Sequence, residues 1–304
     1  MAISRHQLVK ELEPGLNALF GLEYKRYDNQ HAEIYTSESS DRAFEEEVML
    51  SGFGNASVKS EGSGVAFDNA QESYSARYTH ETVALAFAIT EEAIEDNLYD
   101  RISSRYTKAL ARSMSNTKQV KAAAPLNNGL PSVDGFDSGD GVSLFNTAHT
   151  TVSGTNVKNT LTTQADLNET SLEQAMIDIS SMTDERGLRI AAKAVKMIVP
   201  SANQFQAERL MKSQGRVGTA DNDINSLASM GMIPQGYRVN NFLTDTDSFY
   251  IITDVPNGMK MFTRAPLTTA MEGDFDTGNV RYKARERYSF GVSDFRGIFG
   301  VEGA

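Results

Sequence analysis

Few residues of this chain could do chemistry, and none completes a catalytic or metal-binding pattern. His149 could act as the base for a serine nucleophile, but the sequence has no GxSxG elbow and shows no acid partner for this histidine. The chain has no cysteine, which excludes disulfides, thiolate catalysis and cysteine-ligated zinc. Its four histidines lie at no spacing typical of a metal site. We therefore predict no catalytic residue, no cofactor and no metal site.

Three glycine-rich segments could bind ions or phosphates. The run DGFDSGDG at residues 134–141 offers the carboxylate oxygens that calcium prefers, but its spacing is not that of an EF-hand and no glutamate closes the loop. The Gly52–Gly54 and Gly62–Gly64 segments do not continue into a phosphate-binding motif. The sequence favours plain turns or loop tips at all three places.

The clearest charge pattern lies near the C-terminus, where a basic residue occurs at every second position. This spacing places the basic residues on one face of a β-strand, whose other face is apolar except for Glu286. A solvated face is the simplest interpretation, ion pairing within or between subunits is the second, and contact with phosphates is the third. Two further charged residues, Lys59 and Glu61, lie just before Gly62 in the predicted hairpin tip. The candidate interface residues are therefore Lys59, Glu61, Arg281, Lys283, Arg285 and Arg287.

The composition limits the class of partner. The 304 residues carry 29 basic and 40 acidic side chains, a net charge of −11. An acidic chain gains little from counterion release, so direct nucleic-acid binding is disfavoured as its main activity. We find neither an apolar signal segment nor a run of ~18 apolar residues, and we expect a protein of the cytosol without a membrane span. The length predicts about two domains of ~150 residues.

The first half of the chain predicts an arm, a hairpin and a long helix. Residues 1–20 favour a short amphipathic helix that Pro14 interrupts, and residues 21–41 an extended arm. A long hairpin follows over residues 52–90, with Val83–Ile89 as its returning strand. The next segment repeats apolar residues every fourth position, which predicts a helix over residues 91–123, capped by Thr90 and ended by Pro125.

The second half predicts a compact mixture of helices and strands. A capping box at Thr170 opens a helix, and a second at Ser201 opens another that runs to about Lys212. Strands are expected at residues 194–199, 237–243 and 249–253, and the basic strand closes the chain.

Three stretches resemble one known family. They are LFNTAHT at residues 144–150, the run from Thr183 to Leu210, and the ending from Tyr282 to Gly300 with its GVSDFRG segment. In their order and spacing they resemble the major capsid proteins of tailed bacteriophages with the HK97 fold, and most closely the Mu-like major head subunit family. The resemblance extends over nearly the whole chain.

The resemblance implies an α+β fold of several parts. These are an N-terminal arm (1–45), an extended β-hairpin loop (46–85), a peripheral domain (86–145 and 261–304) that contains the spine helix (91–123), and an axial domain (146–260). Because few residues precede the hairpin, we expect a separate scaffold protein rather than a built-in scaffolding segment.

The resemblance also implies a function. The chain is expected to assemble into homo-hexamers and homo-pentamers of an icosahedral shell that encloses double-stranded DNA without sequence-specific contacts. Its further partners are a scaffold protein, a portal and a decoration protein; the chain is assembled in the host cytoplasm, ends in the virion and contacts no membrane. An encapsulin-like shell around protein cargo is the alternative, and a hydrolase that uses His149 has almost no support in the sequence.

Overall fold

The computed structural model describes residues 5–90, 92, 99–133, 135–216, 223–274 and 278–304. Its two main sheets have four strands each, and helices accompany both, which agrees with the expected α+β class. In spatial order the first sheet consists of β1 (Thr36–Ser39), β10 (Met259–Gly273), β11 (Val280–Val292) and β4 (Glu81–Ile89), and the second of β12 (Ile298–Val301), β9 (Phe249–Thr253), β7 (Ala194–Val199) and β8 (Tyr237–Val239).

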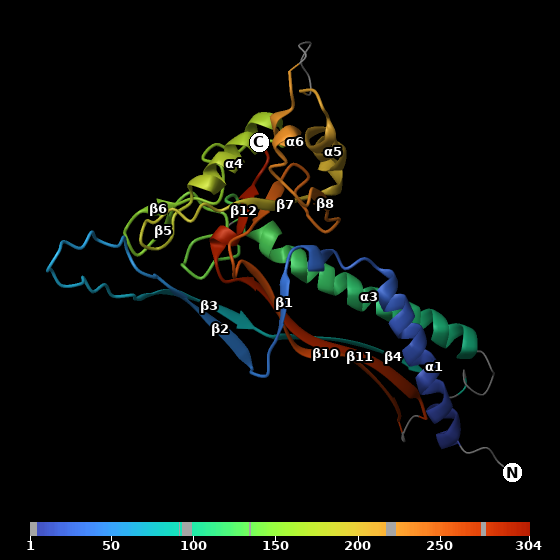
Figure 1. Cartoon of the computed structure of the whole chain (residues 1–304). Coiled ribbons are helices and arrows are strands. Elements are labelled where there is room, and N and C mark those ends of the chain that lie inside the picture. The colour runs from blue at the N-terminus through green and yellow to red at the C-terminus, as the bar shows by residue number, and fades with distance from the viewer. Residues whose placement is uncertain (1–4, 91, 93–98, 134, 217–222, 275–277) are drawn as a thin grey trace.

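Helices cover one face of the first sheet, and none of the described helices lies on the other face (Figure 1). Helix α3 (Tyr99–Asn128) runs along this sheet, and helix α1 (Arg5–Arg26) crosses it. The core between them contains Leu16 and Phe20 of α1, Leu110 and Met114 of α3, and Tyr282 of β11. The predicted apolar stripe of α3 is thus confirmed at Leu110 and Met114. It is wrong at Tyr106, which is 52% exposed.

Helix α1 corrects the predicted arm. It continues through Pro14 to Arg26, so residues 21–26, the start of the segment expected to be extended, are helical. Proline removes one backbone hydrogen bond from the helix interior, but buried Leu16 and Phe20 lie just beyond it and hold the helix on α3 and β11. Tertiary packing here outweighs local propensity. The short helix η1 (Gln30–Glu33) and strand β1 complete the arm.

Helix α3 corrects the predicted helix end. It includes Pro125 and continues to Asn128, because Leu126 is fully buried in the main core and Asn127 bonds the backbone of Phe242 and Thr244. Gly129 follows, where a Cβ atom would lie 2.7 Å from Leu144. The predicted start of this helix, with Ile94 and Leu98 in its apolar stripe, lies outside the described residues.

The hairpin has other strands than the sequence predicts. Its strands are β2 (Phe44–Leu50) and β3 (Glu72–Thr79), which pair antiparallel. The apolar segment Val83–Ile89, predicted as the returning strand, belongs to β4 and pairs with β11 instead. The reason is burial: Val83 and Phe87 pack against the core beneath α3. A two-stranded hairpin offers no comparable apolar surface.

The second sheet lies in the other body of the molecule, with α4 (Glu169–Ser181), α5 (Gln204–Lys212) and α6 (Ser226–Met230) around it (Figure 1).

The predicted strand at residues 194–199 and the predicted helix end at Lys212 are confirmed. The first capping box is displaced: Asn168, not Thr170, accepts the hydrogen bond from Ser171. At the second, η2 (Ser201–Asn203) precedes α5 and no side chain caps the helix. A short ladder of β5 (His149–Thr150) and β6 (Asn156–Val157) and the turn η3 (Phe295–Gly297) complete the described elements.

Candidate assembly surfaces

The root of the hairpin is fixed to the first sheet by packing and by buried polar contacts. Tyr78 of β3 lies against Gly291, where a Cβ atom would be 2.5 Å from the tyrosine ring. Glu47 of β2 pairs with the buried Lys260 of β10, and Ser293 hydrogen-bonds both Glu47 and Tyr78. Any side chain larger than hydrogen at position 291 would displace the ring. The root is therefore a rigid base for whatever the hairpin carries.

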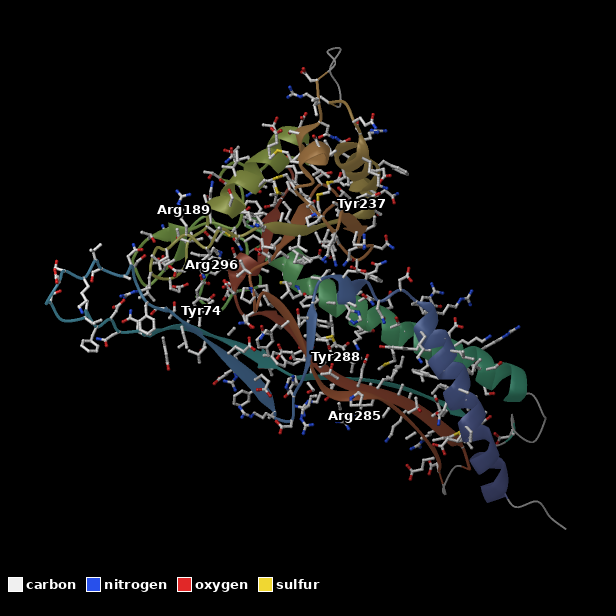
Figure 2. All side chains as sticks on the ribbon, viewed as in Figure 1. Tyr74, Arg189, Tyr237, Arg285, Tyr288 and Arg296 are labelled. Atoms are coloured by element: carbon white, nitrogen blue, oxygen red, sulfur yellow. The ribbon has the colours of Figure 1, made fainter. Side chains whose placement is uncertain are left out.

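A buried ion cluster joins the hairpin to the rest of the chain. Arg296 is 2% exposed and donates to Glu185 at 2.7 Å and to Asp294 at 3.2 Å. The second oxygen of Glu185 accepts from Ser73 Oγ of the hairpin and from the Val152 amide, each at 3.1 Å. Burial raises the pKa of Asp294 even though Arg296 opposes that shift. Figure 2 labels Arg296 between the two bodies, above Tyr74 of the hairpin.

The loop between the two hairpin strands exposes large apolar side chains. Residues 51–71, here called the tip loop, project away from both bodies (Figure 1). Val58 is 98% exposed and Phe67 is 97% exposed, which is unusual for side chains of this size. The candidate residues Lys59 and Glu61 also lie here, fully on the surface. Phe53 and Val65 of this loop are also exposed, and Leu50, Val48 and Phe44 continue the exposed apolar surface along β2.

The predicted basic face exists on β11. Arg281, Lys283 and Arg285 are exposed and Arg287 is half-buried, while the alternating residues point toward the helices. Figure 2 labels Arg285 on the side of this sheet that faces away from helix α3. The interrupting residue Glu286 is buried and pairs with Lys118 of α3 at 3.2 Å, and burial raises the pKa of Glu286.

The surroundings of the basic face are small and nearly uncharged. Arg281 pairs with Asp274, but in the described part of the chain Lys283, Arg285 and Arg287 have no carboxylate within ion-pair distance. The face, here called the basic face, is therefore a row of cations between two rows of short side chains. Its flanking residues are Thr82, Ala84, Ala86 and Ala88 on β4 and Ala265, Thr268, Ala270 and Glu272 on β10.

The structure does not bring the six candidate residues together within one chain. Lys59 and Glu61 lie on the tip loop, whereas the basic face lies on the first sheet, at a distance from that loop (Figure 1). If these residues contact each other, they do so between copies.

His149 has a structural role in this arrangement. The ring is fully buried, stacks on Phe295 at 3.9 Å, and bonds Asp140 through Nδ1 at 2.6 Å and Asn159 through Nε2 at 3.1 Å. Asp140 is the acid partner that the sequence did not reveal. Burial raises the pKa of Asp140, but hydrogen bonds from His149 and Ser138 outweigh this effect and lower it. With both ring nitrogens occupied, His149 is not available to activate a serine.

The aspartate-rich run forms a turn rather than a cluster of ligands. Asp140 is committed to His149 and Ser138, and Asp134 lies outside the described residues. Among the described side chains, no group of three histidines or carboxylates could hold a metal ion. Of the described helices, none has an apolar run that would cross a bilayer.

The comparisons with known proteins identify the family. The model of the family described as phage capsid protein matches residues 73–301, which is most of the chain. The chain belongs to the phage capsid protein family. No curated protein matches this capsid protein in sequence. The match includes nearly all of β3, the buried ion cluster, the second sheet, and the first sheet except for β1.

Solved capsid structures share the fold of this capsid protein. The virus-like particle from Pyrococcus furiosus is 10% identical, with a TM-score of 0.54 and coverage of 95% of this chain and 98% of that chain. The capsid of Myoviridae phage XM1 is 13% identical, with a TM-score of 0.54 and 89% of each chain covered. The capsid of an empty GTA particle is 16% identical, with a TM-score of 0.52 and 90% and 89% covered. At these identities the likeness shows the fold alone, and it confirms the expected capsid fold.

Membership of this family makes the chain a structural, non-enzymatic capsid shell protein. Sequence reasoning did not identify the buried ion cluster. Its members Glu185 and Arg296 are 111 positions apart. The signals were two stretches that carried the family resemblance, the run from Thr183 to Leu210, which contains Glu185, and the GVSDFRG segment, which contains Arg296; neither revealed that the two residues pair.

Proposed function

We propose that this capsid protein is the major head subunit of a tailed phage, of the Mu-like subfamily. Its copies would form hexamers and pentamers of an icosahedral shell around double-stranded DNA, without sequence-specific contacts. A scaffold protein, a portal and a decoration protein would be its other partners. The shell would be assembled in the host cytoplasm and remain in the virion.

The observation that supports this proposal most strongly is the rigidly rooted hairpin with an exposed apolar tip loop. Large exposed apolar patches mark interaction sites, and the apolar side chains of this loop belong to none of the buried clusters formed by the described residues. A contact between the tip loop of one copy and a different surface of the next is heterologous. Repeated contacts of that kind close into rings when the rotation between copies permits.

The proposal includes the division of the chain into the four parts that the family resemblance implies. The proposed parts are the arm (1–45), the extended loop (46–85), the peripheral domain (86–145 and 261–304) and the axial domain (146–260). The two main sheets support a division into two bodies. Because β12 pairs with β9, we assign residues 298–301 to the axial domain instead.

The basic face is proposed to meet an acidic surface of a neighbouring copy. Three of its cations lack an acidic partner in the described chain, while the chain as a whole carries 11 more acidic than basic residues. Such complementarity favours correct docking more than it adds affinity. Lys59 and Glu61 are proposed to take part from the tip loop.

Replacing all four cations of the basic face by glutamine is expected to raise the protein concentration needed for assembly by about tenfold, the combined effect of several weak surface ion pairs. Light scattering at a series of concentrations measures this. Added salt should weaken assembly of the wild type more than that of the variant, because exposed pairs are screened. The control removes four exposed cations elsewhere: Lys25, Arg105, Lys108 and Arg112. Equal assembly of variant and wild type would contradict the proposed role.

An encapsulin-like compartment for protein cargo is the second candidate, and the net charge of −11 favours it. Particles isolated from the producing cells and treated with nuclease decide between the two. The head-subunit proposal expects double-stranded DNA to survive inside the particles. Particles that contain no DNA and one abundant second protein would instead support the compartment.

A further inference from the structure

One ion pair connects the tip loop to the body of the same chain. Arg186 Nη2 donates to Asp68 Oδ1 at 2.9 Å and to Oδ2 at 3.1 Å. The same carboxylate accepts from the Gly54 amide at 2.7 Å and from the Asn69 amide at 2.9 Å. Asp68 therefore joins both sides of the loop to Arg186. These two amides, and then the charge of Arg186, lower the pKa of Asp68.

Apart from this pair, few contacts join the tip loop to the rest of the chain. Across the residues that the structure describes, the pair is the one hydrogen-bonded or ionic contact from residues 51–71 to the chain outside the hairpin. The remaining bonds of the loop, such as Ser51 to Gln71 and Ser63 to Ser60, are internal to it. Its apolar side chains belong to none of the buried clusters.

The arginine projects from a firm support. The Asp184 side chain accepts from the amides of Arg186 and Leu188, at 2.9 and 2.7 Å, and closes a tight turn. Gly187 of this turn has a φ of +84°, a conformation that glycine adopts readily. Glu185, between Asp184 and Arg186, is part of the buried ion cluster. One end of the ion pair is therefore fixed, and the other end is the loop.

We propose that the Asp68–Arg186 pair is a strut that fixes the direction in which the tip loop presents its apolar side chains to a second copy of this chain. The inference rests on the proposed function, since it takes the tip loop as the docking surface. Without the strut the loop would sample many orientations, and each docking event would have to order it first, which weakens binding. Asp68 and Arg186 are positioning residues in this account and need not touch the partner.

The absence of cysteine from the chain allows a direct test on the isolated subunit. Spin labels at Ser60→Cys in the tip loop and Ser180→Cys on α4 report the distribution of distances between loop and body by pulsed electron resonance. Asp68→Asn and Arg186→Gln are each expected to broaden this distribution about twofold or more, and high salt should do the same to the wild type. The matched controls Glu61→Gln and Arg189→Gln make the same charge changes at exposed neighbours and should leave it unchanged.

A reversed pair separates the strut from a local folding effect. Asp68→Lys combined with Arg186→Glu restores opposite charges and should narrow the distribution in part, because lysine cannot accept a hydrogen bond from the Gly54 amide. Either change alone should not narrow it. The unlabelled Asp68→Asn and Arg186→Gln proteins should require a several-fold higher concentration for assembly. An unchanged distribution in both variants would overturn the strut. A broadened distribution with unaltered assembly would overturn its role in docking. If even the wild type never assembles, the proposed function fails, and the distance measurement still decides whether the strut exists.

Discussion

Removal of residues 52–70 is expected to leave a folded subunit that forms no closed shells. The ends can be rejoined without strain, because the Ser51 amide donates to the Gln71 carbonyl at 2.9 Å. An Asn-Gly linker suits such a closely spaced antiparallel pair. The deletion leaves the root contacts of Glu47 and Tyr78 in place. Circular dichroism and thermal unfolding should match the wild type, and electron microscopy should show no closed particles.

A second variant keeps the length of the loop and removes only its apolar surface. Serine at each of its four large apolar positions should prevent assembly almost as completely, because burial of these side chains is the proposed source of docking energy. Ser57→Ala and Ser60→Ala are milder changes at exposed positions of the same loop and should permit shells. Closed particles of wild-type diameter from the deleted protein would show that the tip loop is not the docking surface. The four positions are Phe53, Val58, Val65 and Phe67.

Arg296→Met is expected to be the most destabilising single substitution, with a loss of about 3–5 kcal/mol in the free energy of unfolding. Methionine fills much of the same space but leaves Glu185 and Asp294 buried without their cation. Urea unfolding followed by circular dichroism measures the loss. The exposed control Arg285→Met, which removes no ion pair in the described chain, should change stability by less than ~0.5 kcal/mol.

The loss in Arg296→Met should depend on pH with a definite sign. Burial already raises the pKa of Asp294 in the folded protein, and removal of Arg296 raises the pKa of that carboxyl further. The folded state then binds protons more tightly than the unfolded state, so stability falls as pH rises above the unfolded pKa. The defect should therefore be larger at pH 7 than at pH 5. Glu185→Gln with Asp294→Asn in the same background should recover part of it, and a defect independent of pH would contradict the ionic explanation.

The sequence predicted those helices and strands that are determined by the spacing of apolar and charged residues within one segment. The basic face follows from a period of two along one strand and is found as expected. The helix near Thr170 is also found, as α4. The long helix was foreseen for the same reason, since its stripe of apolar residues lies within one segment. The family resemblance supplied the architecture, and the fold comparisons agree with it.

The remaining features depend on partners that are distant in sequence. Pro14 and Pro125 are signals to end a helix, and both helices continue because Phe20 and Leu126 are buried by other elements. The returning strand of the hairpin was assigned to the apolar segment β4, whereas the hairpin uses the more polar β3. The apolar segment pairs with β11 instead, because the first sheet can bury its side chains. The acid partner of His149 lies in a run that resembles an ordinary turn.

This chain is expected to build shells from many copies of itself. Electron microscopy of the purified recombinant protein in negative stain, alone and with a co-expressed scaffold candidate, tests it most directly. Closed icosahedral particles, tubes or rings of capsomers are the predicted result. A monodisperse monomer or dimer under every condition would contradict the account.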